Sequence, residues 1–171
     1  MITNEYKRNM IISNASTLIL LVKVGIIRKF IDELGVITIP SEVENEIIAG
    51  DTFDSKILKK EIEDKHIVVR TIRSSTKNVL KEFKMHEGEA EAFVLFNECG
   101  AKAILTDDGE LIKLCKLFEI PFINALSIIT RMFEKGKLTH IEACEYLLKL
   151  NAYGRYSKKV YDYFKQEVNC P

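Results

Sequence analysis

The sequence predicts an α/β domain in which helices cover both faces of a parallel sheet. Short β-branched runs alternate with helical patterns over the first 124 residues, which is typical of repeated strand–helix–strand units. The runs are almost entirely apolar, as expected for strands buried on both sides. Residues 125–171 give helical patterns only. We therefore expect one domain over residues 1–171, with an α/β core at 1–124 and a helical C-terminal extension at 125–171.

The predicted elements follow one another closely. Strands are expected at residues 10–13, 36–39, 67–71, 103–106 and 121–123. Two helices broken at Gly25 fill residues 16–34, and further helices are expected at 41–49, 54–65, 88–99, 108–118, 125–135, 139–150 and 157–168. Right-handed crossovers and pairing of consecutive strands favour the strand order 3-2-1-4-5. In such sheets a ligand binds at the carboxyl ends of the strands where the order reverses, here after the first and fourth strands.

Polar side chains stand at those two strand ends. Asn14 follows the first strand, and Asp107 and Asp108 follow the fourth. Each could instead cap the helix that comes next, and Asp108 is the better candidate for an N-cap. The strand ends thus offer oxygen ligands, with helix capping as the alternative.

Glu89 stands out among the acidic residues of its helix. At 100° per residue it falls on the same stripe as Phe93 and Phe96, whereas Glu91 lies on the opposite side together with Glu87 and Glu98. A buried carboxylate needs a cationic partner, a raised pKa or a metal ion. Its place in the first helical turn, where the helix dipole favours an acid, is the alternative explanation.

A further acid is expected from the helix at residues 41–49. The helical wheel does not choose among Glu42, Glu44 and Glu46, and a solvated acidic face is the simplest interpretation there. With one of them, the candidates form an all-oxygen set of the kind that Mg²⁺ and Mn²⁺ prefer. Such sets commonly serve phosphodiester chemistry. The sequence has no phosphate-binding glycine loop, nucleophile elbow or dinucleotide fingerprint that would indicate another reaction.

The chain is electrically neutral overall, with 25 basic and 25 acidic residues, but its charge is unevenly distributed. Residues 56–84 carry nine basic and four acidic side chains, and the flanking blocks are acidic. A basic block beside an acidic site would guide a phosphate backbone, and solvated helix faces are the alternative. The candidate RNA contacts are Arg70, Arg73, Lys77, Lys81 and Lys84.

The four cysteines show no C-x-x-C pair and no histidine at metal-ligand spacing, which argues against zinc. Three of them lie beside apolar residues in helical patterns, where a small buried thiol is the expected role. Surface positions are expected for all three histidines. The longest apolar runs are far too short for a membrane span, and we expect a cytoplasmic protein.

Four segments together resemble the PIN domains, in particular the bacterial and archaeal branch related to VapC-type toxins. They are Ile11-Ile12-Ser13-Asn14-Ala15-Ser16-Thr17-Leu18-Ile19, Ile39-Pro40-Ser41-Glu42-Val43-Glu44-Asn45-Glu46-Ile47, Gly88-Glu89-Ala90-Glu91-Ala92 and Ile104-Leu105-Thr106-Asp107-Asp108. The C-terminal helices are also similar to that branch, so the resemblance spans nearly the whole chain. Each motif is degenerate alone, but four in this order and spacing are fairly specific.

The resemblance implies a three-layer α/β/α sandwich and a metal-dependent ribonuclease acting on single-stranded RNA, often with a small antitoxin partner and as a homodimer. It implies catalytic roles for Glu46, Glu89 and Asp107, and it selects Glu46 over Glu42. Metal ligands would come from Asn14, Glu46, Glu89, Asp107 and Asp108, with Ser16 and Glu91 in support. Asn14 stands where active PIN nucleases usually have aspartate, so a weakened or inactive member that only binds RNA or a protein is the alternative. An unrelated domain that binds a small phosphorylated ligand is a third.

Overall fold

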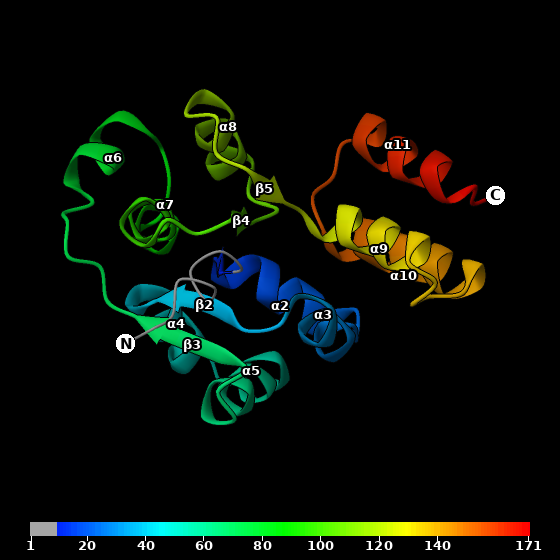
Figure 1. Ribbon diagram of the computed structural model, residues 1–171, viewed down its shortest axis with the longest axis horizontal. Helices are drawn as coiled ribbons and strands as arrows, with labels where there is room; N and C mark the ends of the chain where they lie inside the picture. The colour runs from blue at the N-terminus through cyan, green and yellow to red at the C-terminus, as the bar shows by residue number, and fades with distance from the viewer. Residues whose placement is uncertain (1–9) are drawn as a thin grey trace.

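The computed structural model of the protein describes residues 10–171, so the first nine residues of the predicted domain lie outside it. All five strands run parallel in one sheet of order β3-β2-β1-β4-β5, which confirms the predicted topology (Figure 1). The strands are β1 (Ile11–Ser13), β2 (Ile37–Pro40), β3 (Ile67–Arg70), β4 (Ala103–Leu105) and β5 (Phe122–Ile123). Each bound lies within one residue of the predicted bound.

The predicted helices are present, together with one that the sequence analysis misses. They are α2 (Ala15–Lys23), α3 (Ile27–Leu34), α4 (Ser41–Ala49), α5 (Phe53–Glu63), α6 (Lys77–Glu82), α7 (Glu87–Cys99), α8 (Gly109–Leu117), α9 (Ala125–Glu134), α10 (His140–Tyr153) and α11 (Lys158–Val168). Gly25 separates α2 from α3 with a φ of +77°, a conformation that glycine adopts easily. The missed helix, α6, has no buried residue and therefore no apolar periodicity to reveal it.

Side chains on the central strands alternate between two apolar clusters, one on each face of the sheet. Ile11 and Leu105 belong to the cluster that includes α2, α4 and α5, whereas Ile12 and Ile104 belong to the cluster formed with α7 and α8. Figure 1 shows α7 and α8 on one side of the sheet and α3 and α5 on the other. These layers confirm the expected α/β/α sandwich.

The C-terminal helices α9, α10 and α11 pack together beside the first of these clusters (Figure 1). Leu126, Leu147 and Val168 are fully buried or nearly so, and they belong to the same cluster as Leu18 and Leu21 of α2. The helical end therefore shares its apolar core with the sheet. No helix in the described range has both the length and the apolar character needed to cross a membrane.

The cysteines differ in part from the expectation of buried thiols. Cys115 fits it, because the residue is fully buried and burial raises the pKa of its thiol to about 11. Cys99 is half-buried and free. Cys144, one turn into α10, is not a free thiol, since it forms a disulfide with Cys170 after the end of α11. The sequence spacing of these two residues, 26 positions, gave no sign of the pairing.

Helix α4 begins without a side-chain cap of its own, because Pro40 stands at its N-cap. Glu91 of α7 supplies the missing acceptor, and its carboxylate accepts a 2.9 Å hydrogen bond from the backbone N–H of Glu42. The glutamate at position 91 of the PIN-like motif thus has a structural role, which is to hold α4 against α7.

We expect Glu91→Ala to destabilise the protein by about 1 kcal/mol, the usual effect of losing an N-terminal cap. In a protein of this size that loss lowers the melting temperature by about 2–4 °C. Thermal unfolding followed by circular dichroism measures it. Glu91→Gln keeps an acceptor oxygen and should retain most of the stability; equal losses in the two variants would contradict the capping role.

Candidate functional site

Two neighbouring hollows lie at the carboxyl ends of the central strands. They have volumes of about 450 and about 430 Å³, and both are lined by Ser16, His86 and Glu89. The first also has Asp107 and Asp108 in its lining, and the second has Asn14 and Glu46. Every residue that the sequence analysis names as a metal ligand therefore lines one of these two adjoining hollows.

The sheet brings the first two positions together. β1 and β4 are paired neighbours, with Ser13 opposite Leu105, so Asn14 and Asp107 both come directly after the paired ends. Asn14 is buried, and its side chain accepts a long 3.4 Å hydrogen bond from the N–H of Thr17 as the N-cap of α2. Its amide nitrogen donates to the hydroxyl of Ser16 at 3.0 Å. The capping alternative for Asn14 is thus realised, through a weak bond.

The carboxylate of Asp107 is held by the C-terminal region. The backbone N–H of Ala125, at the start of α9, donates to its two oxygens at 3.1 and 3.2 Å, and the hydroxyl of Tyr156 donates to Oδ1. The backbone N–H of Asp107 donates to Thr17 Oγ1 of α2 at 2.8 Å. Asp107 is therefore fixed from both sides, and its carboxylate binds the first N–H of α9, whose N-cap is Asn124, rather than capping α8.

Asp108 is the N-cap of α8, as its position suggested. Its Oδ1 accepts hydrogen bonds from the N–H groups of Glu110 and Leu111 at 2.9 and 2.8 Å. Within residues 10–171 no group donates a hydrogen bond to its second oxygen, Oδ2, and Asp108 lines the first hollow.

Glu89 is half-buried rather than fully enclosed on the apolar face of α7. Its Oε2 accepts a 2.7 Å hydrogen bond from the N–H of His86, which makes it the third residue of a capping box. The first-turn explanation for this acid is therefore correct in part, and burial alone does not require a metal at Glu89. The carboxylate nevertheless lines both hollows.

Glu46 is the acid of α4 that lines a hollow, whereas Glu42 accepts a hydrogen bond from Asn45 at 3.0 Å. Glu46 reaches the site because Gly88 leaves room in the first turn of α7: a Cβ at Gly88 would collide with the carboxylate of Glu46 and meet Val43 Cγ2 at 3.2 Å. The glycine of the Gly88-Glu89 pair thus permits the close approach of α4 and α7 at the site.

Three of these carboxylates titrate above their ordinary range. Burial is the largest cause for each: it raises the pKa of Glu46, Glu89 and Asp107. The charge of Glu89 raises the pKa of Glu46 further, and that of Asp108 acts likewise on Glu89. The bonds from Tyr156 and Ala125 lower the pKa of Asp107 without cancelling the effect of its burial.

These acids form no ion pairs within the described residues, although Lys23 and Arg155 line the first hollow with them. Among the ion pairs formed by residues 10–171, none includes Glu46, Glu89, Asp107 or Asp108. Ionisation of this cluster at neutral pH therefore opposes folding, and a bound cation would relieve the repulsion. The carboxylates are also spread out, because no three of them within the described range have oxygens all within 4.8 Å of one another.

The predicted RNA contacts do not line these hollows. Arg70 and Arg73 line a separate one beside Glu98, which lies nine residues after Glu89 in α7, or about 13 Å along the helix axis. Lys77 and Lys81 lie on α6, and Lys84 follows it in the connection to α7. The basic block therefore runs along the flank of α7, beside the acids but not among them.

The residues that complete the first hollow were not predicted from the sequence. Lys23, at the end of α2, and the segment Tyr153-Gly154-Arg155 between α10 and α11 line it, and Tyr156 bonds to Asp107. Lys23 is the basic residue in the last turn of a helix whose start carries Asn14, so it could have been considered. Nothing in the sequence links residues 153–156 to a strand end that precedes them by nearly 50 positions.

Comparison with known proteins agrees with this geometry. The sequence profile of the family DUF3368, described as a PIN domain, matches residues 10–170, which is almost the whole chain. No curated protein matches the sequence. The sheet order, the acids at the strand ends and the extent of the match lead to one assignment: the chain belongs to the PIN domain family.

Proposed function

We propose that this protein is a divalent-metal-dependent ribonuclease that cleaves single-stranded RNA at the hollows beside β1 and β4. PIN domains are generally nucleases, which gives the reaction class. The observation that supports the finer proposal is the set of carboxylates with raised pKa values, without ion-pair partners in the described range, at the strand ends.

The donors suit Mg²⁺ or Mn²⁺. All are oxygens of carboxylates or of an amide, which hard cations prefer over nitrogen and sulfur ligands. We assign the ligand role to Glu46, Glu89, Asp107, Asp108 and Asn14, of which the first three are the proposed catalytic acids. A divalent ion bound there would neutralise phosphate charge and supply a water of lowered pKa.

The chain's own groups have distinct tasks in this proposal. The N–H of Ala125 and the hydroxyl of Tyr156 keep the Asp107 carboxylate oriented, and the capping bond from His86 does so for Glu89. Lys23 and Arg155 line the same hollow as Asp107 and would contact the phosphates of the strand nearest the acids. Arg70 and Arg73, on the flank of α7, would guide the strand farther from the cleaved bond.

A second candidate is a PIN domain that binds RNA or a protein without cutting. Two observations favour it: Asn14 brings no charge to the site, and both oxygens of Asp107 already accept hydrogen bonds within the protein. Because the sequence resembles VapC-type toxins, we extend the first proposal in two ways: the protein would be a toxin with a small antitoxin partner, and it would form a homodimer. These two extensions rest on that resemblance alone.

Replacing Glu89 by glutamine is the direct test. Glutamine keeps the acceptor for His86 N–H but removes the charge, so we expect Mn²⁺-dependent cleavage of single-stranded RNA to fall by about 100-fold or more, since even outer-sphere partners of a metal contribute about 10–100-fold. Exposed Glu145 on α10 gives the control Glu145→Gln, which should cleave normally. Equal cleavage by wild type and Glu89→Gln would reject the ribonuclease proposal.

The stability of the same variant relative to wild type should depend on pH. A carboxylate whose pKa is raised on folding stabilises the folded protein when protonated, and that contribution is lost as the pH rises through the folded-state pKa. Metal-free Glu89→Gln should therefore melt higher than wild type at pH 7, and the difference should shrink as the pH falls toward and below the ordinary value of 4.5. Thermal melts across this range measure it. A difference that grows at low pH would contradict the assignment.

Gly88→Ala tests whether Glu46 is a metal ligand while leaving the fold nearly unchanged. The added methyl group would push the Glu46 carboxylate away, and flexible glutamate can move at little energetic cost. We expect Mn²⁺ affinity, measured by calorimetry, to fall by about tenfold, with a melting temperature changed by less than about 4 °C. Gly109→Ala in the first turn of α8 is the matched control, since its Cβ would meet nothing within 4 Å. Similar metal binding by both variants would argue against Glu46 as a ligand.

Asn14→Asp distinguishes the two candidates. Aspartate keeps the cap for Thr17 and adds a negative charge beside Ser16 and Glu89, so a nearly intact nuclease site should bind Mn²⁺ about tenfold more tightly or better and cleave faster. Asn78→Asp on exposed α6 adds the same charge elsewhere and should change neither property. If Asn14→Asp neither binds metal nor cleaves RNA, the binding module is favoured.

A further inference from the structure

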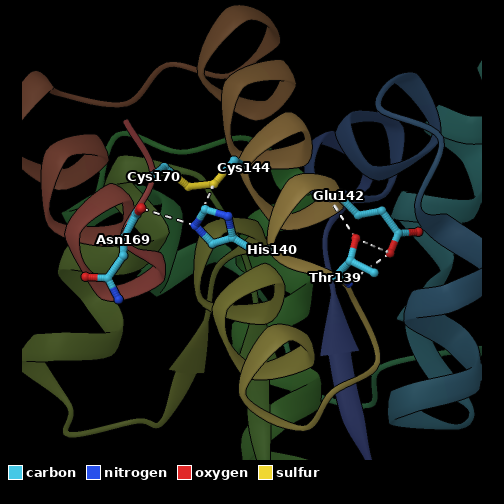
Figure 2. The surroundings of a disulfide bond; sticks show 6 residues. All are labelled: Thr139, His140, Glu142, Cys144, Asn169 and Cys170. Atoms are coloured by element: carbon cyan, nitrogen blue, oxygen red, sulfur yellow. Dashed lines mark hydrogen bonds between the residues drawn. A yellow bond between two sulfur atoms is a disulfide. The ribbon is translucent and has the colours of Figure 1, made fainter.

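A histidine and two cysteines meet where α10 and α11 lie side by side. Figure 2 shows the side chain of His140 next to the sulfur atoms of Cys144 and Cys170. One potential ligand atom from each residue lies within 4.8 Å of the other two. None of the three lines the carboxylate hollows, so this cluster needs an explanation of its own.

Helix α10 places two of the three donors. A reciprocal capping box between Thr139 and Glu142 starts the helix at His140 (Figure 2). His140 and Cys144 are then separated by four positions, so they are neighbours on one face, and the expectation against zinc overlooked this spacing. Nε2 of His140 lies 3.7 Å from Sγ of Cys144.

The third donor is placed by the end of α11. Asn169 adopts the left-handed conformation, the N–H of Asn169 donates to Gln166 O at 3.0 Å, and the N–H of Cys170 donates to Lys165 O at 2.9 Å. These two bonds form a Schellman cap. The fully buried Val168 anchors the same turn in the core. Cys170 is thus directed toward α10 by backbone hydrogen bonds and packing as well as by its disulfide.

We infer that His140, Cys144 and Cys170 form a binding site for a thiophilic divalent cation, of which Zn²⁺ is the natural representative, when the disulfide is reduced. An external dithiol would reduce the S–S bond to two thiols and itself become a disulfide. Binding of the ion then releases one proton from each thiol, which leaves two thiolates and one imidazole as ligands. Sulfur and imidazole donors favour Zn²⁺ over the hard cations assigned to the carboxylates.

The spacing of His140 and Cys144 suits such an ion, and the two sulfur atoms separate once the disulfide is reduced. Zinc bonds of about 2.3 Å to sulfur and about 2.0 Å to nitrogen, at a tetrahedral angle, separate the two ligand atoms by about 3.6 Å. The observed distance from His140 Nε2 to Cys144 Sγ is 3.7 Å. Nε2 also lies 3.1 Å from the carbonyl oxygen of Asn169, so binding through Nε2 puts the imidazole proton on Nδ1 and replaces that hydrogen bond.

The site is accessible and its two states exclude each other. His140 is exposed and both cysteines are half-buried, which leaves the fourth coordination position to water. The same sulfurs cannot hold the ion and the disulfide at once. Both the disulfide and the bound ion would join Cys144 to Cys170. The segment between these two residues contains Arg155, which lines the first carboxylate hollow, and Tyr156, which bonds to Asp107.

Cobalt provides the test, because thiolate-bound Co²⁺ shows a charge-transfer absorption band that carboxylate-bound Co²⁺ lacks. The full-length protein would be reduced with a phosphine, which adds no thiol, and titrated with Co²⁺ without oxygen. We expect a thiolate-to-cobalt charge-transfer band that corresponds to one thiolate-bound Co²⁺ per chain, and Zn²⁺ to abolish it. His140→Gln, which leaves both cysteines in place, and Cys144→Ser should each weaken cobalt binding by about tenfold or more.

The controls separate this site from the other thiols and from the carboxylates. Cys99→Ser removes a free thiol, and Glu89→Gln removes a proposed ligand of the other site; both should keep the band unchanged. The inference is overturned if the phosphine leaves the disulfide intact, if reduced protein gives no charge-transfer band, or if the band survives undiminished in His140→Gln and Cys144→Ser. None of these results depends on whether the protein cleaves RNA.

Discussion

The parallel pairing of β1 with β4 is the constraint on which the rest of the candidate site depends. Two strands separated by about 90 residues of chain become neighbours, with Ser13 opposite Leu105, so the polar residues that follow them emerge at one edge. The backbone bond from Asp107 to Thr17 then fastens the loop after β4 to the first turn of α2. Helices α4 and α7 bring their acids to this edge, and they fit together there because Gly88 has no side chain and Glu91 caps α4.

The site concentrates negative charge that the folded chain does little to compensate. Burial raises the pKa of Glu46, Glu89 and Asp107, and ion pairs elsewhere in the described residues leave these acids out. Proteins rarely retain such an arrangement for stability, because neutral side chains would do better. The unfavourable energy is instead typical of a site that is completed by a ligand of opposite charge.

The sheet was predictable from the sequence because each strand is a short apolar run between clear helical patterns, and chain crossovers limit the possible orders. The strand-end residues followed from that order. Glu46 did not, since its selection over Glu42 depends on the space at Gly88, a contact between two helices. The same holds for Tyr156 on Asp107 and for Cys170 beside His140, where partners far apart in sequence meet only through packing of α9, α10 and α11. Helix α6 escaped detection for another reason, because it buries none of its residues.

The partners of Asp107 change how the boundary near residue 124 should be understood. Its carboxylate is held by Ala125 and Tyr156, and Arg155 lines the hollow in front of it. A fragment ending at residue 124 would still contain all five strands and all four acids of the proposed site. It would lack Ala125 and Tyr156, which donate hydrogen bonds to the Asp107 carboxylate, so the shortest piece of chain that can form the sheet is not the shortest piece that can form the site.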